Sequence, residues 1–210
     1  MSYSKDKTVL GGPGRLIRFS FAEVLKPTHN DEKDKDEYSV MFLIPKSDKE
    51  TLNAINRAVE AFKKEVYGNK IPGNLFNPLQ DGDEYYSSTT GEQDKNRLGC
   101  YYMSAKTCFP PQVKKLVGKK MVDAKTEDDF YSGCYGIASV NFFDWANMGK
   151  RGISAGLSSV CKIKDGERLG GSRADAEKEF AALNFDEFAA DQDDFDEADT
   201  LEIDDDDLPF

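Results

Sequence analysis

Residues 135–164 read YGIASVNFFDWANMGKRGISAGLSSVCKIK, and their pattern is the strongest indication of the fold. Apolar side chains alternate at Ala138, Val140 and Phe142, a period of two that is typical of a strand with one buried face. A second such segment follows, and Asn147-Met148-Gly149-Lys150 between the two favours a turn. The stretch therefore predicts a β-hairpin. Its strands are Tyr135–Ala146 and Gly152–Lys164.

Three earlier segments also predict strands. In the first, Ile17, Phe19 and Phe21 share one face, which we expect to be buried. A cluster of glycines and a proline precedes it and breaks any regular structure there. A highly charged loop over residues 28–37 separates the first segment from the second. The three segments are Arg15–Val24, Tyr38–Ile44 and Leu98–Thr107.

Residues 47–67 predict the main helix. Ser47 and Glu50 have the spacing of a capping box, and Gly68 stands where a glycine commonly ends a helix. Apolar residues recur at alternating intervals of three and four, which places them in one stripe. We expect this stripe to dock on a sheet. Its members are Leu52, Ile55, Val59, Phe62 and Val66.

The order of these elements limits the fold class. About five strands accompany one main helix and do not alternate with helices, which disfavours a parallel sheet built from βαβ units. A lysine-rich run over residues 113–125 contains Gly118 and is consistent with a basic hairpin or loop. The sequence therefore predicts a mainly β domain, an antiparallel β-barrel with one inserted helix.

Charge divides the chain into two regions. Residues 174–210 hold 16 acidic residues and one lysine, for a net charge of −15, whereas residues 1–173 have a net charge of +4. Isolated aromatic and aliphatic residues among so many acids cannot bury enough surface to offset the entropy of ordering the chain. We expect a folded domain over residues 1–171 and a mostly disordered acidic tail over residues 172–210. A weakly basic body with an acidic tail often marks nucleic-acid proteins.

Few residues suggest catalysis. The four cysteines lack the close pairs of a zinc site, so we expect buried thiols, no metal and no cofactor. His29, the one histidine, lies in the charged loop, which disfavours a catalytic triad. Asp81, Asp83 and Glu84 could bind a metal as in nucleases, an alternative that their turn-rich surroundings make weak. We expect a binding protein rather than an enzyme.

One face of the hairpin's first strand mixes large aromatic with small polar side chains. This pattern is typical of a platform on which nucleic-acid bases stack, because bases have apolar faces and polar edges. Tyr102, Ser104 and Lys106 alternate in the same way, and nearby lysines and arginines could neutralise phosphates. The candidate DNA-binding residues are Arg18, Tyr102, Lys106, Lys114, Lys115, Lys119, Lys120, Tyr135, Phe143, Trp145, Lys150 and Arg151.

The last residues form a short docking motif. Leu208 and Phe210 can enter apolar pockets, Pro209 restricts the chain, and the aspartates and terminal carboxylate can meet basic groups. The motif resembles the tip of bacterial single-stranded DNA-binding proteins, in which acidic residues precede isoleucine, proline and phenylalanine. The resemblance implies that the tip recruits partner proteins. The candidate partner-binding residues are Asp205, Asp206, Asp207, Leu208, Pro209 and Phe210.

The body resembles a family of phage and prophage proteins, once of unknown function, that are identified as single-stranded DNA-binding proteins with an OB-fold. The likeness covers roughly residues 14–171 and is carried by four motifs. It implies an OB-like barrel that coats exposed strands during phage replication and recombination; a strand-annealing mediator is the alternative. The motifs are Arg18-Phe19-Ser20-Phe21, Leu43 to Asp48, Tyr131 to Gly136 and Lys164 to Gly171.

Two further expectations concern the setting of the protein. The sequence has no run of about 18 apolar residues and no apolar N-terminal segment, so we expect neither a membrane span nor secretion. A location in the cytoplasm of a bacterial host follows from this and from the resemblance. The expected partners are single-stranded DNA and replication or recombination proteins, with a homodimer as an open possibility.

Overall fold

The structure is a computed structural model that describes residues 2–31 and 34–169; the predicted acidic tail and its tip lie outside these residues. Nine strands, one α-helix and one 3-10 turn form within them. In chain order the elements are β1 (Thr8–Leu10), β2 (Ile17–Asn30), β3 (Lys35–Pro45), α1 (Lys49–Tyr67), β4 (Gln80–Asp81), η1 (Gly82–Glu84), β5 (Cys100–Thr107), β6 (Gln112–Val117), β7 (Lys120–Asp123), β8 (Tyr135–Asn147) and β9 (Lys150–Lys164).

Five of the strands close into a ring. β8 pairs with β2, β2 with β3, β3 with β5, β5 with β9, and β9 pairs back with β8. An odd number of strands cannot alternate in direction all the way around, so one pair must be parallel. That pair is β5–β9, and β6 also joins β9 in parallel. The closed order agrees with the predicted OB-like, mainly β fold with one helix, and two of its pairings, β5–β9 and β6–β9, are parallel.

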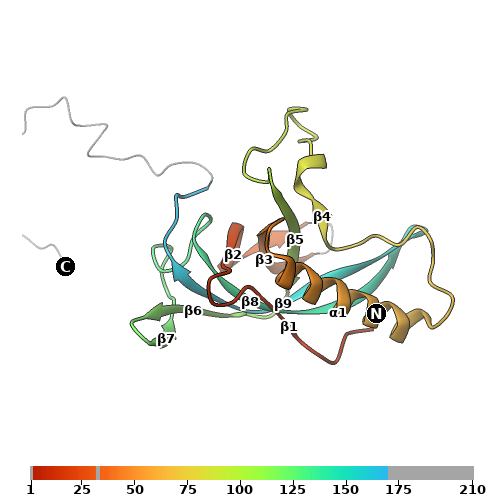
Figure 1. Cartoon of the computed structure of the whole chain (residues 1–210), viewed down its shortest axis with the longest axis horizontal. Coiled ribbons are helices and arrows are strands. Elements are labelled where there is room, and N and C mark those ends of the chain that lie inside the picture. The colour runs from red at the N-terminus through yellow and green to blue at the C-terminus, as the bar shows by residue number, and fades with distance from the viewer. Residues whose placement is uncertain (1, 32–33, 170–210) are drawn as a thin grey trace, which may run out of the picture. The chain divides into compact units, whose positions relative to one another are not determined.

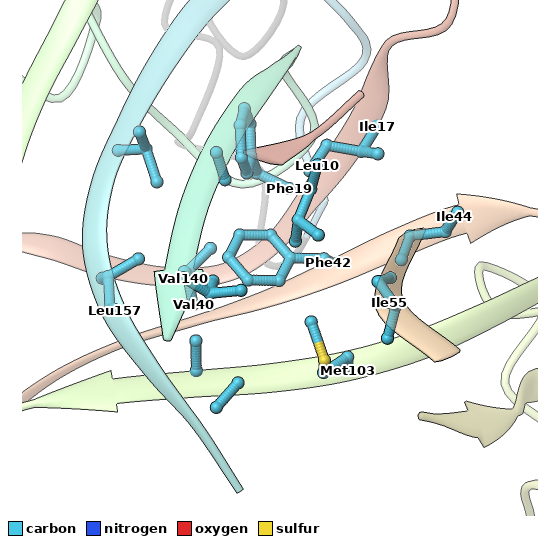
Figure 2. Packing of buried hydrophobic residues seen from close by; sticks show 14 of the residues in the cluster. Leu10, Ile17, Phe19, Val40, Phe42, Ile44, Ile55, Met103, Val140 and Leu157 are labelled. Carbon is cyan, nitrogen blue, oxygen red and sulfur yellow. The ribbon is translucent and has the colours of Figure 1, made fainter. Parts of the chain in front are cut away.

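The hydrophobic core fills the ring. Alternate residues of β2, β3, β5 and β8 point inward, because successive side chains of a strand lie on opposite faces. Figure 2 shows Phe19, Val40, Met103 and Val140 gathered around Phe42. All five are at most 1% exposed. The predicted inward face of Ala138, Val140 and Phe142 is confirmed.

Helix α1 packs beside the ring through its apolar stripe (Figure 1), of which Leu52, Ile55, Val59 and Phe62 are buried. The predicted capping box is wrong by one position. Asp48, not Ser47, is the N-cap, because the Asp48 carboxylate accepts a hydrogen bond from the backbone N–H of Thr51 at 3.0 Å. Gly68 ends the helix with a φ of 56°, as expected. No helix within the described ranges is long and apolar enough to cross a membrane.

Strand β2 contains a bulge that corrects the predicted inward face. Its pairing with β3 shifts between Ser20 and Glu23, and Phe21 adopts a φ of 47°. As a result Phe21 is 60% exposed and Ser20 is buried. The period of two continues only up to Phe19, because a bulge inserts an extra residue and reverses which side chains face the core.

One further segment differs from the expected loop, and the lysine-rich run takes one of its two expected forms. The charged residues 28–37 mostly extend the β2–β3 hairpin, with Thr28 opposite Glu37. The lysine-rich run forms the hairpin β6–β7, whose two-residue turn has Gly118 at a φ of 60°. Glycine at the first turn position is what a type II′ hairpin turn requires. The prediction of a basic hairpin is therefore confirmed.

The cysteines are free, as expected, but differ in burial. Cys134 and Cys161 are buried, Cys100 is half-buried and Cys108 is exposed. Burial raises the pKa of the Cys134 thiol to about 11, so that thiol stays protonated and unreactive near neutral pH. The expectation of buried thiols is confirmed for two of the four.

Candidate nucleic-acid interface

The side of β2, β3 and β5 that points away from the core carries polar and aromatic side chains, and we call it the outer face. Three cross-strand rows build it: Arg18–Leu43–Tyr102, Ser20–Met41–Ser104 and Glu23–Ser39–Lys106. Ser104 is exposed and Ser39 is half-buried, whereas Ser20 and Leu43 in the same rows are buried. Phe21, which follows Ser20 at the bulge, adds an exposed aromatic ring. Sequence periodicity assigned Phe21 to the core and therefore missed it.

Arg18 and Tyr135 meet at one corner of the outer face. The Arg18 guanidinium lies 5.4 Å from the centre of the Tyr135 ring. It also donates hydrogen bonds to the backbone carbonyls of Gly133 at 3.3 Å and Glu167 at 2.9 Å. Arg18 therefore ties the segment after β9 to β2. Some of its donors are already used, which leaves it fewer for a phosphate than the sequence suggested.

Tyr102 belongs to a cluster that sequence reasoning missed. The Arg97 guanidinium lies 3.5 Å from the centre of the Tyr85 ring and 4.5 Å from that of Tyr102. Its Nε donates to Asp94 at 2.9 Å, and Arg97 is only 5% exposed. The cluster holds the connection from η1 to β5 against the end of the outer face. Tyr102 is thus fixed in orientation, but part of its ring is covered.

Lys46 links the same region through two ion pairs. Lys46 Nζ lies 2.6 Å from an Asp81 carboxylate oxygen and 2.7 Å from one of Asp83. Hydrogen bonds to these two carboxylates raise the pKa of Lys46, and the Lys46 ammonium lowers the pKa of each aspartate. Two of the three carboxylates considered as metal ligands, Asp81 and Asp83, therefore hold a lysine. Among the described residues, no group of acidic, histidine or cysteine side chains is arranged to hold a metal ion.

The opposite end of the outer face carries charges of both signs. Lys106 is half exposed and lies 3.6 Å from Glu37 across the strands. Glu23 faces Ser39 in the row that contains Lys106. A strand of DNA at this end would meet Lys106 together with acidic neighbours, so the electrostatic gain there is smaller than a lone lysine would supply.

The four lysines of the β6–β7 hairpin divide into two pairs. Lys114 forms an ion pair with Asp123, and Lys115 forms one with Asp129. The hydrogen bond from Lys115 lowers the pKa of Asp129, which keeps that carboxylate charged. Lys119 and Lys120 are exposed and have no ion pair with any residue that the structure describes. Half of the predicted phosphate contacts on this hairpin are thus neutralised within the fold.

The far end of the β8–β9 hairpin holds the remaining predicted residues. Phe143 packs against Tyr3 at 5.5 Å between ring centres, and Trp145 packs against Phe76 at 6.2 Å. A Cβ atom added at Gly152 would lie 2.7 Å from the Trp145 ring, so the indole rests directly on that glycine. The indole N–H is buried without a hydrogen-bond acceptor. Lys150 and Arg151 are exposed at the turn.

The structure thus places the predicted DNA-binding residues in three groups rather than one. Arg18, Tyr102, Lys106 and Tyr135 lie on or beside the outer face. Tyr135 and Trp145 begin and nearly end the same strand, ten residues apart, which corresponds to about 33 Å at about 3.3 Å per residue. The far end of β8–β9 is therefore a separate surface, whereas the lysine hairpin joins β9 near the Tyr135 end of the β8–β9 hairpin.

Comparison with known proteins identifies relatives. The family model described as "Enterobacter phage Enc34, ssDNA-binding protein" matches residues 7–196. Protein p50 of Acyrthosiphon pisum secondary endosymbiont phage 1 is 29% identical over 172 residues, which cover 80% of this chain and 91% of that protein.

Solved structures show the same fold. The single-stranded DNA-binding protein of bacteriophage Enc34 in complex with ssDNA has a TM-score of 0.63 and 22% identity, covering 74% of this chain and 87% of that one. The single-stranded DNA-binding protein gp2.5 of bacteriophage T7 has a TM-score of 0.51 and 15% identity, covering 87% of this chain and 98% of that one.

Proposed function

Because this chain belongs to the Enc34 phage family of single-stranded DNA-binding proteins, we propose that it binds single-stranded DNA without sequence preference and catalyses no reaction. The family match carries the proposal, and the outer face supplies a place for the ligand. In OB-folds the second and third strands of the ring carry the oligonucleotide, and here those strands are β3 and β5.

The chemistry of the outer face supports sequence-independent binding. Phe21 and the uncovered part of Tyr102 offer rings on which any base can stack. Arg18 and Lys106 supply positive charge at opposite ends, and the small, exposed Ser104 between them leaves room for the strand. No base-specific set of paired donors and acceptors is needed, because stacking and phosphate contacts supply the affinity.

The proposal is tested by titrating a labelled oligo(dT) and a duplex of equal length, following fluorescence anisotropy. We expect clear preference for the single strand. We also expect log affinity to fall with log salt at a slope near −3 to −4, from about four to six phosphates at about 0.7 each. Equal affinity for both ligands, or no response to salt, would contradict the proposal.

A matched pair of variants locates the ligand. Ser104 is exposed at the centre of the outer face, whereas Ser47 is exposed before α1. Ser104→Glu should weaken binding about tenfold, because it sets a carboxylate among phosphates, while Ser47→Glu should have little effect. Equal effects of the two substitutions would place the DNA elsewhere.

The proposal extends to the setting in which the protein acts. We propose that it coats strands exposed during phage DNA replication or recombination, and that the acidic C-terminus recruits partner proteins. Support comes from the sequence of the tip, where Leu208 and Phe210 flank Pro209 behind four aspartates. A pull-down from infected cells with the full chain, and with a chain lacking residues 208–210, tests recruitment. Partners that bind both equally would contradict it.

A further inference from the structure

The β6–β7 hairpin exposes an unusual amount of apolar surface. Leu116 and Val122 are each 38% exposed, Val117 is 55% exposed and Met121 is 67% exposed. Figure 1 shows this hairpin projecting from the closed ring. Single exposed apolar side chains are common, but several on one projecting element indicate a surface that another molecule covers.

Strand β7 also has an unpaired edge. It ends the strand order of the sheet, so one side of β7 has no partner strand within the residues that the structure describes. Val117 and Lys120 flank the two-residue turn and form the hydrogen-bonded pair that closes the hairpin. Hydrogen bonding then alternates along the strand. The backbone N–H and C=O of Met121 and Asp123 therefore face the free edge, where they can pair with another strand.

The sequence of β7 is self-complementary in one register. Two identical strands that pair antiparallel about a two-fold axis must place residues of the same face opposite each other. In the register centred on Met121, Met121 faces Met121 of the second copy, and Lys119, the turn residue that precedes β7, comes beside Asp123 of the second copy. The next register, centred on Val122, would set Lys119 opposite Lys125, so like charges disfavour it.

We propose that two copies of this chain associate through the free edges of β7 in the register centred on Met121. The two hairpins then form one four-stranded sheet. Leu116 lies opposite Met121 in the hairpin, so one face of that sheet carries a continuous row of two leucines and two methionines. A Lys119–Asp123 contact borders the row on each side, where the Asp123 carboxylate also pairs with Lys114 of its own hairpin. This inference does not depend on DNA binding.

The contact is small, which determines its strength. A stable interface buries about 800 Å² per partner, and one short hairpin edge supplies less than that. We therefore expect reversible association with a dissociation constant on the order of 10–100 µM.

Sedimentation velocity of the full chain without DNA, from about 5 to about 200 µM, tests the association across that range. Met121→Lys should weaken it about tenfold or more, since it sets two ammonium groups against each other. Met148→Lys is the matched control, because Met148 is 96% exposed at the β8–β9 turn and the charge change is the same. That variant should associate like the unchanged protein. Circular dichroism checks that both variants fold.

A charge swap tests the register itself. Lys119→Glu alone sets carboxylates opposite each other, and Asp123→Lys alone sets ammonium groups opposite each other. Each variant should be monomeric by itself, whereas an equimolar mixture should form heterodimers, because both contacts between the two variants then join opposite charges. A chain that stays monomeric up to the highest concentration would overturn the proposal. So would association unaffected by Met121→Lys, or a mixture that does not associate.

Discussion

The outer face of β2–β3–β5 and the far end of the β8–β9 hairpin both combine aromatic rings with basic side chains. They differ in whether other segments of the chain cover those rings. On the outer face, serines separate the rings and Phe21 is left exposed. At the far end, Tyr3 packs on Phe143, and Phe76 packs on Trp145. The first region leaves the Phe21 ring exposed, while the second uses its rings to attach an N-terminal segment and a loop to the sheet.

An aromatic–polar alternation therefore identifies the outward face of a strand, but it does not show whether other segments cover that face. Tyr3 is 140 residues away in sequence from Phe143, and Phe76 is 69 residues away from Trp145, the rings that they cover. Whether a ring can stack on a base depends on such distant segments.

Arg97→Ala should have the largest effect and should disrupt the outer face. It removes a desolvated cation–π cluster, worth about 2 kcal/mol, and a charge-assisted hydrogen bond. We expect a loss of about 3 kcal/mol in the free energy of unfolding, measured by urea denaturation. Weaker binding of single-stranded DNA should accompany it, because Tyr102 loses its support. Arg97→Lys keeps the charge but not the planar stack, so it should rescue only part of the loss.

Trp145→Ala should lower stability rather than DNA affinity. The indole is half-buried against Gly152 and Phe76, so its removal leaves a gap and should cost about 2 kcal/mol in the free energy of unfolding. A thermal melt and an oligo(dT) titration on the same sample separate the two effects. If stability were unchanged while affinity fell by about 1–3 kcal/mol, the far end would be a base-stacking surface and the contrast would fail.

Phe21→Ala should show the opposite behaviour. The side chain is 60% exposed at the bulge, so we expect almost no change in stability and a loss of about 1–2 kcal/mol in affinity for single-stranded DNA. Phe109→Ala is the control, because Phe109 is 79% exposed in the loop between β5 and β6. An equal effect of the two substitutions would argue against a specific role for the outer face.

Deleting residues 174–210 should have the smallest effect and reports which region the tail competes for. The tail carries a net charge of −15 beside a body of +4. Tethered acidic side chains can mimic phosphates at high local concentration, so the deletion should tighten DNA binding, most visibly at low salt. Deleting only residues 208–210 should leave affinity unchanged. If Ser104→Glu abolishes this tightening of DNA binding, the tail competes for the outer face. Weaker DNA binding after the long deletion would contradict the expected competition.

Much of the fold followed from local patterns. The β8–β9 hairpin, the apolar stripe of α1 and the basic β6–β7 hairpin each obey a period or a turn rule that a short window of sequence contains. The failures were at positions where a neighbour decides the outcome. Phe21 left the core because β2 bulges where Ala22 bonds to Ser132, a residue 110 positions away.

The candidate site was predicted less well than the fold. The sequence identified Arg18, Tyr102, Lys106 and Tyr135, which the ring order brings to one surface. It missed Arg97 and Phe21, because an arginine in a turn-rich stretch is expected to be exposed to solvent and an aromatic residue in a regular strand is expected to be buried. It also counted Lys114 and Lys115 as free charges, although aspartates from later in the chain pair with them.

Local sequence patterns were enough to predict the main strands, the helix and the charge division, since each depends on the chemistry of neighbouring residues. Only the tertiary structure decided that β5 lies parallel to β9, which rings are covered and which lysines are paired. Closing the ring brings together segments that are distant in sequence, and a period of two or of 3.6 residues contains no information about that closure. The surface on which DNA binding is proposed is therefore a product of the ring, built from residues that local patterns supply.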